Sequence, residues 1–172
     1  MMRSPLVMLM LVVAPLLVIQ TRVAIAQQYV VVVLDDSGSM DERMRSAGRV
    51  RRIDAAKQAL KGVLSNLPAE TNVGVLALNS TVNSSPWIVP LGPLGQANWQ
   101  QNINSLQANG GTPLGESLKT AADALLAARE NQMYGSFRLL VVTDGEANDP
   151  QLVDQYLPQI MARTLTVDVI GV

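Results

Sequence analysis

Runs of β-branched and aliphatic residues alternate along the chain with segments that repeat apolar residues at helical spacing. Such runs favour strands buried on both faces of a parallel sheet, and we expect them at residues 29–34, 71–78, 137–142 and 164–172. A shorter run at 87–89 has proline on each side, which suits an edge strand. Helical spacing predicts helices at 53–67, 98–108, 113–125 and 149–160, with Pro158 kinking or splitting the last. The alternation predicts an α/β fold layered around a mostly parallel sheet.

The first 26 residues have a pattern of their own, because 19 of them are hydrophobic. A basic start at Arg3, an apolar run over residues 6–19 and the small-residue triplet Ala24-Ile25-Ala26 predict a secretory signal peptide over residues 1–26. Cleavage after Ala26 would leave a secreted or periplasmic protein. The alternative is an uncleaved membrane anchor that keeps the domain outside the cytoplasm. The apolar run would extend about 21 Å as a helix, however, against roughly 30 Å of bilayer core.

The amino-acid composition limits which metal ligands and catalytic groups the chain can provide. The 172 residues include no His and no Cys, which excludes disulfides, thiolate metal sites and imidazole-based catalysis. Any metal must therefore bind oxygen ligands, which favours Mg²⁺, Ca²⁺ or Mn²⁺. Residues 27–172 suit one domain, and with 11 basic against 14 acidic side chains they offer no electrostatic reason to expect a nucleic-acid partner.

Three polar segments follow predicted strands or precede a predicted helix. They are Asp35-x-Ser37-x-Ser39 after the first strand, Thr112 before a helix, and Asp144 after the fourth run. Ligands of open α/β sheets bind beyond the carboxyl ends of the strands, so these segments converge if the two strands are neighbours. Three hydroxyls and two carboxylates suit a divalent cation and leave a sixth position for water or an outside carboxylate. Local hydrogen-bonded turns would also explain the first segment taken alone.

The three segments resemble the metal-ion-dependent adhesion site of the von Willebrand factor type A domain. The matching stretches are VVLDDSGSM at 32–40, GGTPL at 110–114 and VVTDGE at 141–146, and the resemblance covers residues 28–172. It implies a Rossmann-like, doubly wound α/β/α sandwich with one antiparallel edge strand, here 87–89. It implies that Ser37, Ser39 and Thr112 bind Mg²⁺ (Mn²⁺ or Ca²⁺ being possible) directly or through water, while Asp35 and Asp144 hold coordinated waters.

The resemblance also implies adhesion or assembly through a partner's Asp or Glu carboxylate, rather than catalysis. Domains of this family normally continue beyond the strand that ends at Val172, so we expect residues 27–172 to lack a last helix and edge strand. One rival interpretation is a metal-dependent phosphotransferase of the haloacid dehalogenase type, although its usual second Asp is Ser37 here. Another is a structural domain that uses no metal.

Three further features have simpler explanations. Trp87 and Trp99 are expected to pack in the core, and Glu146 to cap a turn. A basic cluster near the predicted site is expected to be a solvated helix face, with recruitment of an acidic partner as the alternative. It consists of Arg43, Arg45, Arg49, Arg51 and Arg52.

Overall fold

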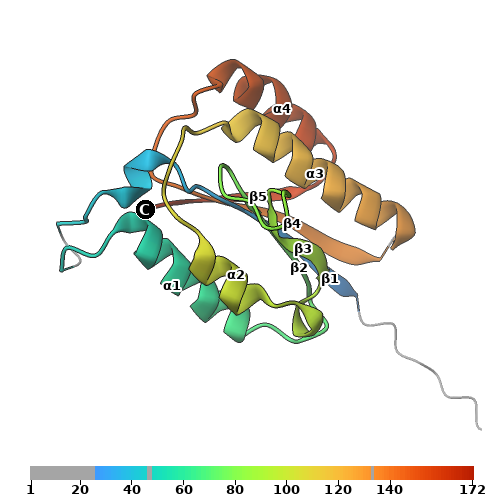
Figure 1. Cartoon of the computed structure of the whole chain (residues 1–172). Coiled ribbons are helices and arrows are strands. Elements are labelled where there is room, and N and C mark those ends of the chain that lie inside the picture. The colour runs from blue at the N-terminus through green and yellow to red at the C-terminus, as the bar shows by residue number, and fades with distance from the viewer. Residues whose placement is uncertain (1–25, 46–47, 133) are drawn as a thin grey trace, which may run out of the picture.

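The computed structural model describes residues 26–45, 48–132 and 134–172 (Figure 1). The predicted signal peptide, apart from Ala26, lies outside these residues and stays a prediction. Within the described ranges, no helix is both long enough and apolar enough to cross a membrane.

A five-stranded sheet forms the middle layer and confirms the predicted fold class. Its strands are β1 (Gln27–Leu34), β2 (Asn72–Ala77), β3 (Trp87–Pro93), β4 (Gly135–Thr143) and β5 (Thr166–Gly171). Their spatial order is β3-β2-β1-β4-β5. Every neighbouring pair is parallel except β2 and β3, so the proline-flanked run is the antiparallel edge strand.

Helices cover both faces of the sheet. On one face lie α1 (Arg52–Ser65) and α2 (Trp99–Ser105), and on the other lie α3 (Leu114–Asn131) and α4 (Pro150–Ala162) (Figure 1). Successive strand side chains point to opposite faces, and the run in β1 supplies both cores. Val32 and Leu34 join the cluster under α1, whereas Val31 and Val33 join the cluster under α3. This double burial is the physical reason for the uninterrupted β-branched run.

Several elements differ from their predicted bounds, and α3 continues past 125 to Asn131 while α2 ends at Ser105. Strand β3 continues to Pro93, well past the predicted 87–89. Its edge position allows this, and Pro90 lies where the pairing with β2 shifts register between Val73 and Val75. Helix α4 runs through Pro158 without splitting, which leaves a kink as the alternative of the prediction that remains. The helix packs against α3, and its Ile160 is 4% exposed, which compensates for the hydrogen bond that proline removes. Trp87 and Trp99 do pack on the cores.

The order of strands decides where the predicted site lies. Strand β1 sits between β2 and β4, and the register pairs Leu34 with Val142. The residues that follow β1 and β4 therefore emerge side by side at the carboxyl edge of the sheet. The neighbouring arrangement on which the predicted convergence depended is confirmed.

Candidate metal centre

The turn after β1 presents two hydroxyls side by side. Asp35 and Ser37 are 1% and 2% exposed, whereas Ser39 is exposed. The backbone N–H of Ser37 donates to Asp35 Oδ1 at 2.8 Å, and the Ser37 and Ser39 hydroxyl oxygens are 3.0 Å apart. A short 3-10 helix, η1 (Gly38–Asp41), continues the chain from this turn. The turn thus places the Ser37 and Ser39 hydroxyls next to each other.

The end of β4 joins this turn through two side-chain hydrogen bonds. Ser39 Oγ donates to Asp144 Oδ1 at 2.8 Å, and the Asp144 side chain is only 1% exposed. Thr143 Oγ1 donates to Asp35 Oδ2 at 2.6 Å. Thr143 was not among the predicted site residues, although its place beside Asp144 at a strand end was a usable signal. Four of the five predicted residues are thereby linked through side chains or the turn backbone.

Thr112 reaches the same edge through its loop. The N–H of Gly38 donates to the Gly110 carbonyl at 3.0 Å, and the N–H of Asn109 donates to the Asp36 carbonyl at 2.8 Å. Thr112 is 7% exposed, and Asn148 clamps it by accepting from its backbone N–H and donating to its carbonyl at 2.9 Å. Among the described residues, no hydrogen bond joins the Thr112 hydroxyl to the other four site residues. We call Asp35, Ser37, Ser39, Thr112 and Asp144 the strand-end site.

Two acidic residues that the sequence analysis did not single out hold these loops in place. Asp36 is fully buried, and its carboxylate accepts from the backbone N–H groups of Asn79 at 2.8 Å and Ser80 at 2.7 Å. Asp149 precedes α4 as predicted, and in addition its carboxylate accepts from the N–H of Gly115 at 3.0 Å, in the first turn of α3. Carboxylates that bind exposed helix N–H groups are stabilising. Both residues therefore connect segments that are distant in sequence.

The basic cluster divides into two parts. Arg43, Arg45 and Arg49 are exposed, as expected for a solvated surface. Arg51 lies 2.8 Å from Asp54, and this hydrogen bond and charge lower the pKa of the Asp54 carboxyl. Arg52 instead contacts the strand-end site.

Arg52 Nη1 lies 2.7 Å from Asp144 Oδ2 and 3.0 Å from Glu42 Oε2, and it approaches the Ser39 carbonyl at 3.3 Å. The expectation of a purely solvated face is therefore wrong for this residue. Charge and proximity in sequence indicated only that Arg52 lay near the rim, not that it would touch Asp144.

The oxygen donors fit a small hard cation. In an octahedral shell with ligands at the Mg²⁺ distance, neighbouring oxygens lie about 2.9 Å apart. The Ser37–Ser39 and Ser39–Asp144 oxygen pairs are 3.0 and 2.8 Å apart. No group of three His, Cys, Asp or Glu side chains arranged to hold a metal occurs among the described residues. A metal at this edge would thus depend on neutral hydroxyls together with two carboxylates.

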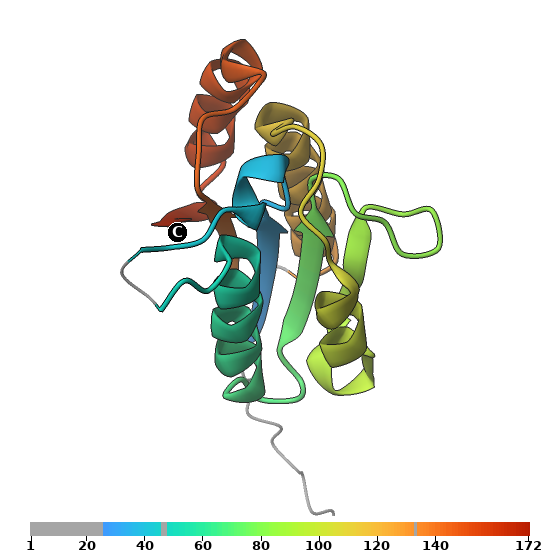
Figure 2. The ribbon, with the colours of Figure 1, turned by 60° about the vertical axis from the view of Figure 1, so that its left-hand side comes forward.

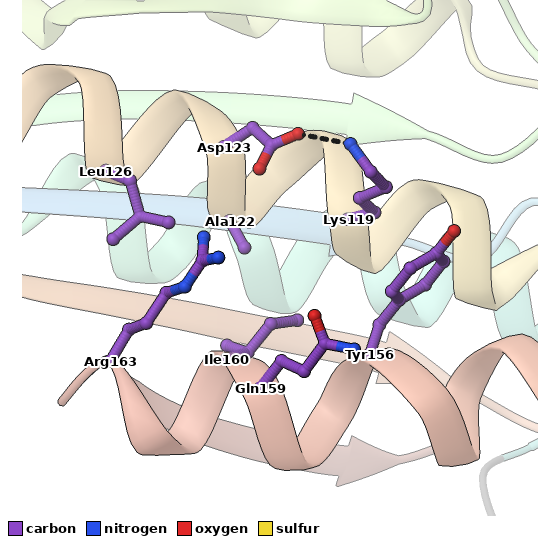
Figure 3. Close-up of a pocket in the computed structure, with 8 residues that line it drawn as sticks. All are labelled: Lys119, Ala122, Asp123, Leu126, Tyr156, Gln159, Ile160 and Arg163. Atoms are coloured by element: carbon purple, nitrogen blue, oxygen red, sulfur yellow. Dashed lines mark hydrogen bonds and ion pairs between the residues drawn. The ribbon is translucent and has the colours of Figure 1, made fainter.

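A separate hollow of about 170 Å³ lies between α3 and α4 (Figure 3). Lys119 and Arg163 reach toward it, and the Lys119 amine is paired with Asp123 at 2.6 Å. None of the strand-end site residues lines it. Lys119 and Arg163 are positively charged, and the Asp123 carboxylate is paired with Lys119. The hollow therefore offers no cation site of the predicted kind.

Fold and site together define an α/β module with a cluster of oxygen donors at the carboxyl edge of its sheet. The family model of the von Willebrand factor type A domain matches residues 30–146. The chain belongs to this family, whose domains generally serve as protein-interaction or adhesion modules. None of the curated proteins compared with the chain matches it.

Solved structures show the same fold at low sequence identity. A von Willebrand factor type A protein from Catenulispora acidiphila is 24% identical, with a TM-score of 0.63 over 85% of this chain and 33% of that one. The manganese-loaded TRAP protein of Plasmodium vivax is 17% identical, with a TM-score of 0.62 over 86% and 57%. The PilB minor pilin from Streptococcus sanguinis, solved as a mutant, is 20% identical, with a TM-score of 0.53 over 73% and 31%. The chain thus spans less than two thirds of each of these proteins.

Proposed function

We propose that this chain is a metal-dependent protein-binding module that captures an Asp or Glu carboxylate of a partner protein at the strand-end site. Mg²⁺ is the cation that we assign first, with Mn²⁺ or Ca²⁺ as substitutes. The observation that carries the proposal is the contiguous, hydrogen-bonded row of Ser37, Ser39 and Asp144 oxygens, whose 3.0 and 2.8 Å separations are compatible with an octahedral shell. When bound, the ion would supply an electrophilic position for the incoming carboxylate.

The protein's own residues divide the work at this site. Ser37, Ser39 and Thr112 offer neutral oxygens, which leave more of the ion's charge for a partner. Asp35 has one oxygen on the N–H of Ser37 and the other on the hydroxyl of Thr143. It therefore orients the ligand turn and adds negative charge behind it, which supports a role through coordinated water.

The competing phosphotransferase chemistry finds less support. It needs a general acid two residues after the nucleophilic Asp, and that position carries Ser37, whose hydroxyl lies 3.0 Å from that of Ser39. Domains of this family are generally non-enzymatic, and we propose no reaction for the chain. A signal peptide over residues 1–26, and hence a secreted or periplasmic module, forms part of the proposal.

Metal titration of the purified protein tests the proposal. We expect Mg²⁺ or Mn²⁺ to raise the thermal unfolding temperature, because a ligand that binds only the folded state stabilises it by about 2.7 kcal/mol at 100 times its Kd. Asp35→Asn and Ser37→Ala should abolish most of this shift. Glu146→Gln, which removes an exposed carboxylate from the same rim, is the matched control and should keep it. A parent protein whose unfolding is the same with metal and with chelator would refute the proposal.

A further inference from the structure

We propose that Arg52 sets how tightly the strand-end site holds a divalent cation, because its fixed positive charge neutralises part of Asp144. This inference rests on the proposed function, since it concerns the same site. Its basis is the 2.7 Å contact between Arg52 Nη1 and Asp144 Oδ2, made across 92 residues of sequence.

The guanidinium is held in place from several directions. Arg52 is the first residue of α1, and its backbone N–H donates to the Glu42 carbonyl at 3.0 Å. This bond fixes the start of α1 beside η1, an arrangement visible in Figure 2. The same Nη1 contacts the Ser39 carbonyl at 3.3 Å, and the side chain is 28% exposed. Arg52 therefore acts as part of the site's structure rather than as a mobile surface charge.

The two carboxylate oxygens of Asp144 contact different neighbours, a hydroxyl on one side and a guanidinium on the other. Its Oδ1 accepts from the Ser39 hydroxyl at 2.8 Å, on the side of the other oxygen donors, while its Oδ2 faces Arg52. Because the Asp144 side chain is 1% exposed, solvent screens the ion pair with Arg52 only weakly. A cation that uses Asp144 must therefore share this carboxylate with a positive charge already bound to it.

The charge count gives the direction of the effect. Asp35 and Asp144 contribute two negative charges, and Arg52 reduces the sum to one. The Glu42 carboxylate also pairs with Arg52, but its side chain is 67% exposed, so its contribution is screened. Affinity at oxygen-ligand sites follows the number of charged ligands. Arg52 should thus weaken binding of the bare cation and leave excess positive charge that favours an added carboxylate from outside.

Arg52 could also have the opposite effect and strengthen metal binding, if it were needed to orient Asp144. Without Arg52, however, Asp144 would keep its bond to the Ser39 hydroxyl. It would also keep its backbone position directly after β4, where Val142 pairs with Leu34. Orientation therefore has other sources, whereas no other positive side chain contacts Asp144 among the described residues.

Isothermal titration with Mn²⁺ alone separates these effects. The parent is compared with Arg52→Gln, Arg52→Met and Arg52→Lys. Arg51→Gln is the matched control, because Arg51 is the adjacent residue, carries the same charge and pairs with Asp41 and Asp54 instead of the site. We expect Arg52→Gln and Arg52→Met to bind Mn²⁺ at least about tenfold more tightly. Arg52→Lys and Arg51→Gln should stay within about threefold of the parent.

Each outcome has a distinct meaning. Unchanged or weaker Mn²⁺ binding by both neutral variants, with the parent binding normally, would overturn the inference while the proposed function stands. Binding by the neutral variants alone would support the effect assigned to Arg52 but would overturn the proposed function, because the parent protein itself would bind no metal. Failure of the parent and of every Arg52 variant to bind Mn²⁺ would overturn the proposed function and this inference together. Urea unfolding of each variant shows that the affinities compared are those of folded proteins.

Discussion

Replacement of Asp36 by Asn should destabilise the domain strongly, although the change only exchanges one carboxylate oxygen for an NH₂ group. The fully buried carboxylate accepts from the backbone N–H groups of Asn79 and Ser80 at 2.8 and 2.7 Å. An asparagine offers one acceptor oxygen, so its NH₂ group would face one of these two donors. A hydrogen bond to a charged group contributes about 1.5–3 kcal/mol, and a buried donor without a partner costs about 1–3 kcal/mol. We therefore expect the free energy of unfolding to fall by about 2–5 kcal/mol.

Urea unfolding followed by circular dichroism measures this loss, with a chelator in every sample so that metal binding does not contribute. Asp41→Asn is the control, because the Asp41 side chain is 63% exposed and, among the described residues, its one ion pair is the surface pair with Arg51. It should change the stability by less than about 1 kcal/mol. If Asp36→Asn is no more destabilising than Asp41→Asn, the role assigned to the Asp36 hydrogen bonds is wrong.

Thr143→Val removes the hydroxyl that binds Asp35 and should weaken Mn²⁺ binding by about 10- to 100-fold in calorimetric titrations, as for other residues that orient metal ligands. Thr120→Val, which removes a hydroxyl bonded to a helix carbonyl away from the site, should leave the Mn²⁺ affinity unchanged, and equal affinities for both variants would refute the assignment. Arg51 lowers the pKa of the Asp54 carboxyl below its ordinary value of 3.8. The contribution of the Arg51–Asp54 pair to stability is therefore complete above pH 3.8 and is lost as the pH falls through the lower pKa of the folded state. Both side chains are about 40% exposed, so Asp54→Asn should reduce the acid dependence of unfolding by less than about 1 kcal/mol, and a larger change would contradict the pairing as described.

The arrangement of strands and helices followed from local patterns. The run Val30–Leu34 alternates between two cores, which requires helices on both faces, and the prolines around 87–89 required an edge. The convergence of Asp35 and Asp144 needed one further fact from the structure, that β1 and β4 are parallel neighbours and so end at one edge of the sheet. Metal binding by these residues stays a prediction, whereas the structure shows that they lie at the same edge of the sheet.

The sequence by itself thus determined the class of fold, the elements and the edge at which polar side chains gather, since periodicity and turn residues act over a few neighbouring positions. Only the tertiary structure decided which charges meet there. Arg52 reaches Asp144 because the Glu42 carbonyl fixes the start of α1. The Asp149 carboxylate binds the start of α3, in addition to the bonds that its carbonyl accepts in α4, because α3 and α4 pack together. These contacts join residues 92 and 34 positions apart, and their distances depend on how whole helices dock on the sheet.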